Sequence, residues 1–410
     1  MVKTKENKFE ERIYGYALKN AVEHEGRCVA GSVLSPLFAE GLQKEEVKLI
    51  MSKINDAVKK VNSLSMEEQK SEFDKISEKL SHRDVRDPNE LPELPGAVKG
   101  KVIMRFAPAP SGALHIGHVI PGMISSLFVK KYGGKFYVRI EDTNPETIEE
   151  SAYENIKKDC DWLFGNVSQY IIQSDRLEVY YKYALELIKK DFAYICTCDP
   201  ESFKELVKKS KPCACRNLNV EKNISRWVRM LDKTKGYKGG EAVLRFKSDL
   251  KNSNPAMRDF PLARINEKQH PKQGNKYRVW PLMNLSVAVD DMEFGMTHII
   301  RGKDHRDNSE RQKMIFKALG KEKQFPWTFF MGRVKFKDIN LSKRKIKAAI
   351  EAGEYEGYED EKLPTLISLR KRGYKPEAFA KFATQRGLTE VDKVMAQKDL
   401  FDVLDRFNRE

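Results

Sequence analysis

The chain has 410 residues, and its 75 lysines and arginines against 60 aspartates and glutamates give a formal net charge of +15. This length suffices for about two to four domains, and the positive charge favours a polyanionic partner, nucleic acid before acidic membrane, with a lysine-rich solvated surface as the alternative. Six cysteines in so long a chain exclude a disulfide scaffold.

The sequence contains no segment that would hold the chain in a membrane. No apolar run approaches the roughly 18 residues that a membrane-spanning helix needs. The first residues, MVKTKENKFEER, lack the apolar core of a signal peptide. We therefore expect a cytoplasmic protein without a membrane partner.

The first part of the chain has the pattern of charged, amphipathic helices. Residues 1 to about 86 are helix-like, and one apolar face consists of Val47, Ile50, Ile54, Val58 and Val61. Residues 87–96 contain three prolines and have the composition of a linker. These patterns predict a helical N-terminal domain with its linker over residues 1–97, in which we find no chemistry.

The stretch from Lys101 to His118, KVIMRFAPAPSGALHIGH, combines three structural signals. Residues 102–106 are apolar and branched, as in a short buried strand. Prolines and a glycine then break the chain, and apolar residues at helical spacing follow from Leu114 until the glycines at 133–134. The stretch therefore predicts a strand, a tight turn and a helix.

The first turn of this predicted helix is suited to bind phosphate. His115 and His118 lie in it, where free backbone N–H groups and the positive end of the helix dipole attract anions. Gly117 between them allows a nucleotide to lie directly against the backbone. The alternative is that the histidines are helix caps or surface residues, because the string HIGH alone also occurs by chance.

A second strand and helix follow in the same order. The strand covers residues 136–140 and ends at Glu141 and Asp142, and apolar residues at helical spacing then extend to Leu163. This order predicts an α/β fold with a parallel sheet. Because ligands of such sheets bind beyond the carboxyl ends of the strands, Arg105, Glu141 and the two histidines should converge on one crevice. Alternatively, the two acids belong to a turn, after which Thr143 or Asn144 caps the next helix.

Four of the six cysteines form two closely spaced pairs. Cys196-Thr-Cys198 is followed, after fourteen residues, by Cys213-Ala-Cys215. Such pairs can supply four thiolates to a tetrahedral structural zinc ion, which would pin the lysine-rich loop between them. The alternative is four thiols without metal.

A basic segment interrupts the predicted nucleotide fold. Residues 225–277 carry arginines and lysines among apolar residues and are strand-like, which predicts an inserted nucleic-acid surface, with solvated basic strands as the alternative. The fold resumes with the apolar residues 285–289, which precede Asp290 and Asp291.

A further short strand over residues 297–300 ends at Arg301. Arg301 would reach the same crevice as Arg105, and two arginines there suit a substrate with one or two carboxylates. Structural pairing of these arginines with Asp290 or Asp304 would look identical in the sequence.

Residues 340–345, NLSKRK, form a short basic loop before helix-like sequence. Lys343 in this loop would neutralise charge on a transferring phosphate. Neither a Walker A string nor a GxGxxG motif occurs in the chain, so a phosphate site would be of the HxGH type.

Taken together, these motifs resemble those of a known family. HIGH at 115–118 and LSKRK at 341–345 resemble the paired signature of class I aminoacyl-tRNA synthetases. RFAPAPSG, RIEDTNP and THIIRGKDH resemble glutamyl-tRNA synthetases in their archaeal form, which is close to the glutaminyl enzymes. The similarity covers residues 98–410, and the N-terminal helices resemble an extension of archaeal members. It implies activation of glutamate with ATP to glutamyl-adenylate and transfer to the 3′ end of tRNA(Glu).

The resemblance also implies a domain organisation: a Rossmann-type parallel-sheet catalytic domain with an inserted acceptor-binding subdomain, flanked by helical N- and C-terminal domains. The expected parts are a first catalytic half at 98–195, the acceptor-stem-binding insertion at 196–277, a second catalytic half at 278–325, and the KMSKS-type loop with a helical stem-contact domain at 326–410.

The resemblance further implies roles for single residues. The expected catalytic residues are His115, His118 and Lys343. The other expected ATP-binding residues are Pro110, Gly117, Leu341 and Ser342. The expected glutamate ligands are Arg105, Ala107, Glu141, Met283 and Arg301. Glutaminyl enzymes lack the last arginine, so Arg301 favours glutamate.

Cofactors and partners follow in the same way. We expect ATP with Mg²⁺, and structural Zn²⁺ on Cys196, Cys198, Cys213 and Cys215. We expect a monomer that charges tRNA(Glu) and, in a relaxed form, tRNA(Gln) as well.

The sequence departs from the family pattern at three positions. Leu341 replaces a methionine, which is an almost neutral exchange. Ala109 replaces a polar residue that many members carry. Met283 replaces a tyrosine whose hydroxyl helps fix the substrate side chain, which affects side-chain specificity and not the reaction class.

The alternatives to this assignment concern the whole protein. Family members of this branch continue into β-barrels that read the anticodon, and the sequence stops before them, either as a fragment or as a natural form. Rival functions are a small adenylyltransferase, an enzyme that glutamylates a tRNA base, and a non-catalytic tRNA-binding module. The intact motifs argue against the last.

Overall fold

The computed structural model describes residues 2–40, 42, 46–77, 80, 87–338 and 342–409. The chain divides into two compact units, Met1–Arg86 and Asp87–Glu410.

Helices make up the first unit within its described residues. They are α1 (Val2–Glu23), α2 (Ala30–Ala39), α3 (Val47–Asn62) and α4 (Met66–Ile76). The predicted apolar face of α3 turns inward, since Ile50, Ile54 and Val61 are buried. Ser65 and Glu68 begin α4 with reciprocal side-chain-to-backbone hydrogen bonds. The expectation of amphipathic helices is confirmed.

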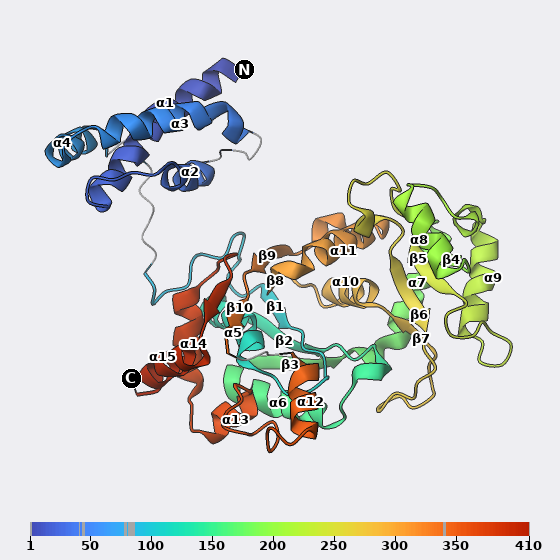
Figure 1. The fold of residues 1–410 in the computed structure, drawn as a ribbon. Coiled ribbons are helices and arrows are strands. Elements are labelled where there is room, and N and C mark those ends of the chain that lie inside the picture. Colours follow the sequence, from blue (N-terminus) through green and yellow to red (C-terminus); the bar gives the residue numbers. More distant parts are fainter. Residues whose placement is uncertain are drawn as a thin grey trace. The chain divides into compact units, whose positions relative to one another are not determined.

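A parallel sheet forms the centre of the second unit (Figure 1). Its strands are β1 (Val102–Phe106), β2 (Gly134–Ile140) and β3 (Val167–Ile172), in the order β1-β2-β3. Helix α5 (Ile116–Tyr132) connects β1 to β2, and α6 (Ser151–Phe164) connects β2 to β3. The strands pair in parallel. The predicted α/β fold is confirmed.

A second pair of parallel strands extends this arrangement next to β1. Strand β8 (His298–Gly302) pairs with β9 (Trp327–Met331). The Thr297 N–H donates to the Ile103 carbonyl at 3.0 Å, and the Thr297 hydroxyl accepts the Ile103 N–H at 2.9 Å. Both β1 and β8 therefore present their carboxyl ends to the same edge. The apolar residues 285–289 before β8 lie in a helix, α10 (Met283–Glu293), and α11 (Arg306–Ala318) follows β8.

An antiparallel sheet lies apart from the parallel one, toward the right of Figure 1. It consists of β4 (Ala193–Cys196), β5 (Val243–Phe246), β6 (Pro261–Ile265) and β7 (Val279–Pro281), in that order. Its helices are α7 (Leu177–Lys189), α8 (Pro200–Lys208) and α9 (Val220–Leu231). The strand expectation for residues 225–277 is wrong at its start, because Asn219 caps α9 and the helix buries Trp227 and Met230 one turn apart.

The C-terminal part packs on the parallel sheet. Its helices are α12 (Lys343–Glu351), α13 (Leu366–Lys371), α14 (Pro376–Arg386) and α15 (Gln397–Arg409). Strand β10 (Val334–Phe336) pairs with β11 (Lys393–Met395). Leu369, Phe379 and Leu404 share one hydrophobic core with Phe128 of α5. The C-terminal helices therefore help to support the helix that carries both histidines.

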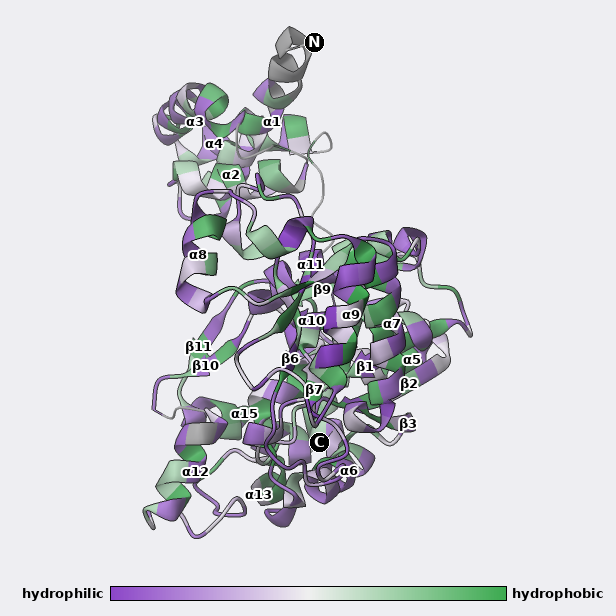
Figure 2. Cartoon of the chain, turned by 90° about the vertical axis from the view of Figure 1, so that its right-hand side faces the viewer, coloured by the Kyte–Doolittle hydropathy of each residue, from purple (hydrophilic) through white to green (hydrophobic). Residues whose placement is uncertain are grey.

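None of the helices in the described part of the chain has the length and apolar composition to cross a membrane. In Figure 2, the helices carry hydrophilic as well as hydrophobic residues along their length.

Candidate active site

A cavity of about 530 Å³ lies at the carboxyl ends of β1, β2 and β8. Nine of the residues expected to bind ATP or glutamate line it: Arg105, Ala107, His115, Gly117, His118, Glu141, Met283, Arg301 and Lys343. Pro110 is buried in the turn after β1 and does not line the cavity, and Ser342 is exposed beside Lys343. Leu341 lies outside the described residues. Segments that are far apart in the sequence therefore meet at one site.

The two histidines form the start of α5. The Gly117 N–H donates to His115 Nδ1 at 3.2 Å, and the His115 N–H donates to His118 Nδ1 at 3.4 Å. The ring centroids lie 3.8 Å apart. Both histidines are thus helix caps, as the alternative interpretation held, and they line the cavity as well. Because Nδ1 accepts a hydrogen bond in each ring, the proton of the neutral imidazole lies on Nε2.

Both imidazoles are neutral near pH 7. Burial, and secondly the charge of Lys343, lower the pKa of His115 to about 3. Burial also lowers the pKa of His118 well below its ordinary value, with His115 and Lys343 adding to the effect. Each ring therefore offers an uncharged Nε2–H donor, and the helix dipole supplies positive potential.

Lys343 supplies the cation at this end of the cavity. Its Nζ donates to the carbonyl of Ala109 at 2.8 Å and to that of Gly112 at 3.3 Å. Burial lowers the pKa of Lys343 to about 8, although the nearby Glu149 opposes the shift. The amine is held by uncharged carbonyl groups in the turn between β1 and α5, so an incoming anion can replace these partners.

Arg105 is bound by an acid of α10. Its Nε and Nη2 donate to the two carboxylate oxygens of Asp291 at 2.9 and 3.1 Å. Arg139, which is fully buried, donates to Asp291 at 2.6 Å and to Glu141 at 3.0 Å. Burial raises the pKa of Asp291, but the two arginines outweigh it and lower the pKa to about 2. Arg105 thus lines the cavity with two of its nitrogens already bonded.

Arg301 differs from the other two arginines. It is 8 % exposed, and it makes no ion pair with any acid among the described residues. Its Nη1 donates to the uncharged Gln312 Oε1 at 2.8 Å, and its Nε has no partner in the described part of the chain. Burial, and next the charge of Arg105, lower the pKa of Arg301 to about 10. A buried guanidinium without a counter-ion favours an anionic ligand.

His305, which was not among the predicted site residues, lines the cavity next to Arg301. The amide of Asn308 lies 3.1 Å from His305 Nδ1 and 3.7 Å from Met283 Sδ. Burial, and then Arg301, lower the pKa of His305. The position of His305 in RGKDH, four residues after Arg301, was the available signal.

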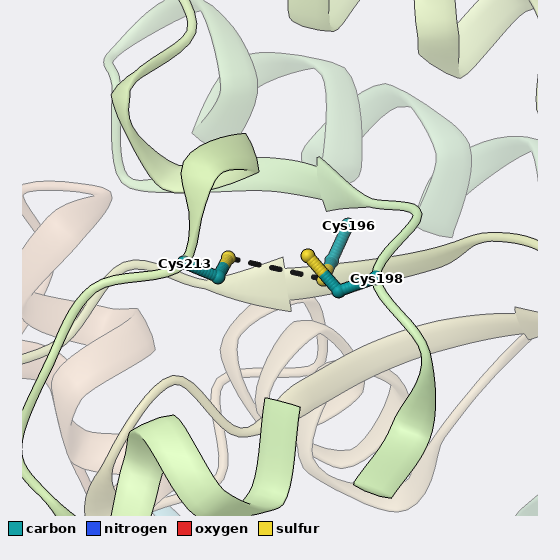
Figure 3. Close-up of side chains that lie close together, drawn as sticks. All are labelled: Cys196, Cys198 and Cys213. Atoms are coloured by element: carbon teal, nitrogen blue, oxygen red, sulfur yellow. Dashed lines mark hydrogen bonds between the residues drawn. The ribbon is translucent and has the colours of Figure 1, made fainter. Parts of the chain in front are cut away.

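The four paired cysteines lie together at the end of β4 and the loop that follows α8. Cys196 Sγ lies 3.9 Å from Cys213 Sγ, and Cys198 Sγ lies 3.8 Å from Cys215 Sγ. Figure 3 shows the sulfur atoms of Cys196, Cys198 and Cys213 close together, and all three lie within 4.8 Å of one another. Four sulfurs around a tetrahedral zinc ion at about 2.3 Å would lie about 3.8 Å apart. The spacing of Cys196, Cys198 and Cys213 therefore fits such an ion, whereas Cys215 lies outside this group of three and meets it through Cys198.

Hydrogen-bond donors also surround one of these sulfurs. Arg226 Nη1 donates to Cys215 Sγ at 3.2 Å, and the Thr197 N–H donates to the same atom at 3.4 Å. Donors of this kind stabilise a thiolate, which is the form that binds metal.

The sequence matches the family described as tRNA synthetases class I (E and Q), catalytic domain, over residues 101–408. The chain therefore belongs to the class I tRNA synthetases and is an aminoacyl-tRNA ligase, a class of enzyme that uses ATP with Mg²⁺.

Within this class, the chain belongs to the glutamate–tRNA ligase family. It is 41 % identical over 393 residues to a glutamate–tRNA ligase of Methanothermobacter thermautotrophicus, with 96 % of this chain and 70 % of the relative covered. It is 43 % identical over 392 residues to that of Pyrococcus abyssi, with 94 % and 68 % covered. A crystal structure of a glutamate tRNA ligase from Elizabethkingia meningosepticum in complex with its amino acid is similar in fold, with a TM-score of 0.54 and 19 % identity over 74 % of this chain and 68 % of that one.

Proposed function

We propose that this protein is a glutamate–tRNA ligase whose cavity binds ATP at the start of α5 and glutamate at Arg301. The observation that carries this assignment is the buried guanidinium of Arg301, which makes no ion pair among the described residues and lines the same cavity as the two Nε2–H donors. A dicarboxylic amino acid supplies one carboxylate for that guanidinium and a second one for the reaction.

The first step joins glutamate to the nucleotide. The α-carboxylate oxygen attacks the α-phosphorus of ATP, the bond to the bridging oxygen breaks, and pyrophosphate leaves with the electron pair. His115 and His118 donate Nε2–H to phosphate oxygens, and Lys343 exchanges its two carbonyl partners for the departing pyrophosphate. Mg²⁺ bound to the phosphates would neutralise part of their charge. No proton is transferred, so the residues act by position and charge.

Glutamate is recognised at the other end. Arg301 receives the side-chain carboxylate, and Glu141, whose Oε1 also accepts from Arg139, attracts the ammonium group. The small side chain of Ala107 leaves room for the substrate backbone, and Met283 contacts its methylene groups. A guanidinium matches a carboxylate better than an amide, so glutamate is selected over glutamine.

In the second step, a hydroxyl of the terminal ribose of tRNA attacks the acyl carbon, the bond from this carbon to the phosphate oxygen breaks, and AMP leaves with the electron pair while the hydroxyl proton is released to water. The antiparallel sheet with α8 and α9 presents lysines and arginines that suit the phosphates of an acceptor stem. We propose a monomer that works in the cytoplasm and charges tRNA(Glu) and also tRNA(Gln). Aminoacylation of both purified tRNAs tests this choice, and failure to charge tRNA(Gln) would restrict the protein to tRNA(Glu).

We further propose that the cysteine cluster holds a structural zinc ion through Cys196, Cys198, Cys213 and Cys215. Metal analysis of the purified chain should find about one zinc per chain, as a four-thiolate site requires. Replacing Cys196 and Cys213 by serine should remove the metal, whereas replacing Cys28, which lies in the first unit, should not. Equal zinc content in both variants would contradict the assignment.

ATP–pyrophosphate exchange, measured with glutamate and tRNA present, tests the whole assignment. Replacing both His115 and His118 by alanine should lower the exchange rate by at least about a hundredfold, because two donors to the transition-state charge are lost. His24→Ala, on an exposed residue of the first unit, serves as the matched control and should leave the rate unchanged. An unchanged rate in the double variant would show that the cavity does not perform this reaction.

A further inference from the structure

Glu149 connects three segments around the ATP end of the cavity. It lies just before α6, and its N–H donates to the Pro110 carbonyl at 2.8 Å. Its carboxylate accepts the Tyr358 hydroxyl at 3.0 Å and forms an ion pair with Lys347 of α12 at 3.3 Å. The Glu149 side chain is 17 % exposed. This residue therefore ties the turn after β1 to two segments that follow Lys343.

The contact between these segments is close. Gly112 in the turn has a φ of +123°, and a Cβ added there would lie 2.9 Å from the Tyr358 hydroxyl and 3.8 Å from Lys343 Cβ. Glycine is required at this position for both conformation and space. Tyr358 thus packs directly on the turn whose carbonyl groups hold Lys343.

Helix α12 has little hydrophobic anchoring of its own. Among its described side chains, only that of Ile346 is buried. Its polar contacts to the rest of the second unit include the Lys343 bonds to the turn and the Lys347 pair with Glu149. A helix held in this way depends on its polar contacts for its position.

We propose that Glu149 is a positioning residue that fixes α12 and Tyr358 against the turn of residues 109–112 and thereby holds Lys343 at the ATP end of the cavity. This inference rests on the proposed function for the reaction that Lys343 serves. Without Glu149, α12 must be ordered in each catalytic cycle, and the cost falls on the step that uses Lys343.

Kinetics of ATP–pyrophosphate exchange test the role of Glu149. Glu149→Ala should lower kcat about tenfold, the loss expected for one charge-assisted contact, and should leave the KM for glutamate within about twofold, since the amino-acid end is untouched. Glu149→Gln keeps an acceptor for Tyr358 and loses only the ion pair, so its kcat should lie between those of Glu149→Ala and the unchanged chain. Glu150→Ala, an exposed neighbouring acid, is the matched control and should be unaffected.

Limited trypsin digestion provides a readout that does not depend on the reaction. Glu149→Ala and Tyr358→Phe should both speed cleavage after Lys343, Arg344 or Lys345. Combining them should add little to the effect of Glu149→Ala, because Tyr358→Phe removes a hydrogen bond that Glu149→Ala has already removed. Unchanged cleavage, or a loss of kcat equal to that in Glu150→Ala, would overturn the positioning role. Absence of exchange in the unchanged chain would instead refute the proposed function. The digestion result would still show whether Glu149 holds α12 in place.

Discussion

The charged groups in and beside the cavity fall into two sets. Lys343 is held by uncharged carbonyl groups in the turn before α5, beside the neutral His115 and His118, and Arg301 makes no ion pair among the described residues. Arg105 and the fully buried Arg139, in contrast, are both bound by Asp291.

The presence or absence of a counter-ion separates buried groups that stabilise the fold from buried groups that bind a ligand. Buried ions that are fully paired contribute to structure, because removing one partner leaves the other without compensation. Buried charged groups without a counter-ion remain available to bind a ligand of opposite charge. By this criterion we expect Arg301 and Lys343 to bind substrates, and we expect Arg105, which Asp291 holds at the edge of the cavity, to stabilise the fold as well.

Asp291→Asn removes the carboxylate that pairs with Arg105 and Arg139 and should have the largest effect on stability. It leaves Arg105 and Arg139 facing an amide, and we expect a loss of about 3–5 kcal/mol in the free energy of unfolding. Urea unfolding followed by tryptophan fluorescence measures this loss, because all four tryptophans lie beyond residue 87 and therefore report on the second unit. Asp304→Asn, on an exposed acid, should cost less than about 1 kcal/mol. Equal losses in the two variants would show that the Asp291 pairs do not stabilise the fold.

The pH dependence of the reaction tests whether the charge of Lys343 is needed. The pKa of Lys343 is about 8, so the lysine is charged below this pH and loses its charge above it. The kcat/KM for ATP should therefore fall about fivefold from pH 8 to pH 9, following the protonated fraction. Lys343→Arg stays charged and should lose this pH dependence, whatever its absolute rate. The same decline in both proteins would assign it to another group.

The smallest expected change is in the free energy of unfolding of Arg301→Met. Arg301→Met removes a buried cation that has no acid partner in the described part of the chain, so the free energy of unfolding should change by less than about 1 kcal/mol or should increase. The same urea titration measures it. A loss as large as that of Asp291→Asn would mean that Arg301 is a structural residue like Arg105.

Much of the fold and the site followed from local sequence patterns. Strand β1, helix α5 and the placement of Arg301 at a strand end depend on nearby residues and on the general rule for parallel sheets, and all three are observed. The cysteine pairs were found for the same reason, because each pair is fixed by its own short spacing.

The acid that pairs with Arg105 could not be predicted from local sequence patterns. Asp290 and Asp291 are neighbours in the sequence, but on α10 they point about 100° apart. Asp290 accepts from Arg176 and Tyr180, whereas Asp291 faces Arg105. Only the rotation of α10 in the folded chain decides which acid meets which arginine.

The contact of Glu149 with Tyr358 was equally inaccessible. The two residues are 209 positions apart, and nothing in their immediate sequence marks either of them as a partner. Such pairs depend on how the C-terminal segments pack on the catalytic sheet, which is a property of the whole core.

The central claim is that Arg301 is the receptor of the substrate side-chain carboxylate. Exchange measured with glutamate and with glutamine, in the unchanged chain and in Arg301→Met, tests it most directly. We predict that the variant loses about a hundredfold or more in kcat/KM for glutamate, with the KM for ATP within about twofold, and no longer prefers glutamate over glutamine. A variant that keeps the full preference for glutamate would contradict the account.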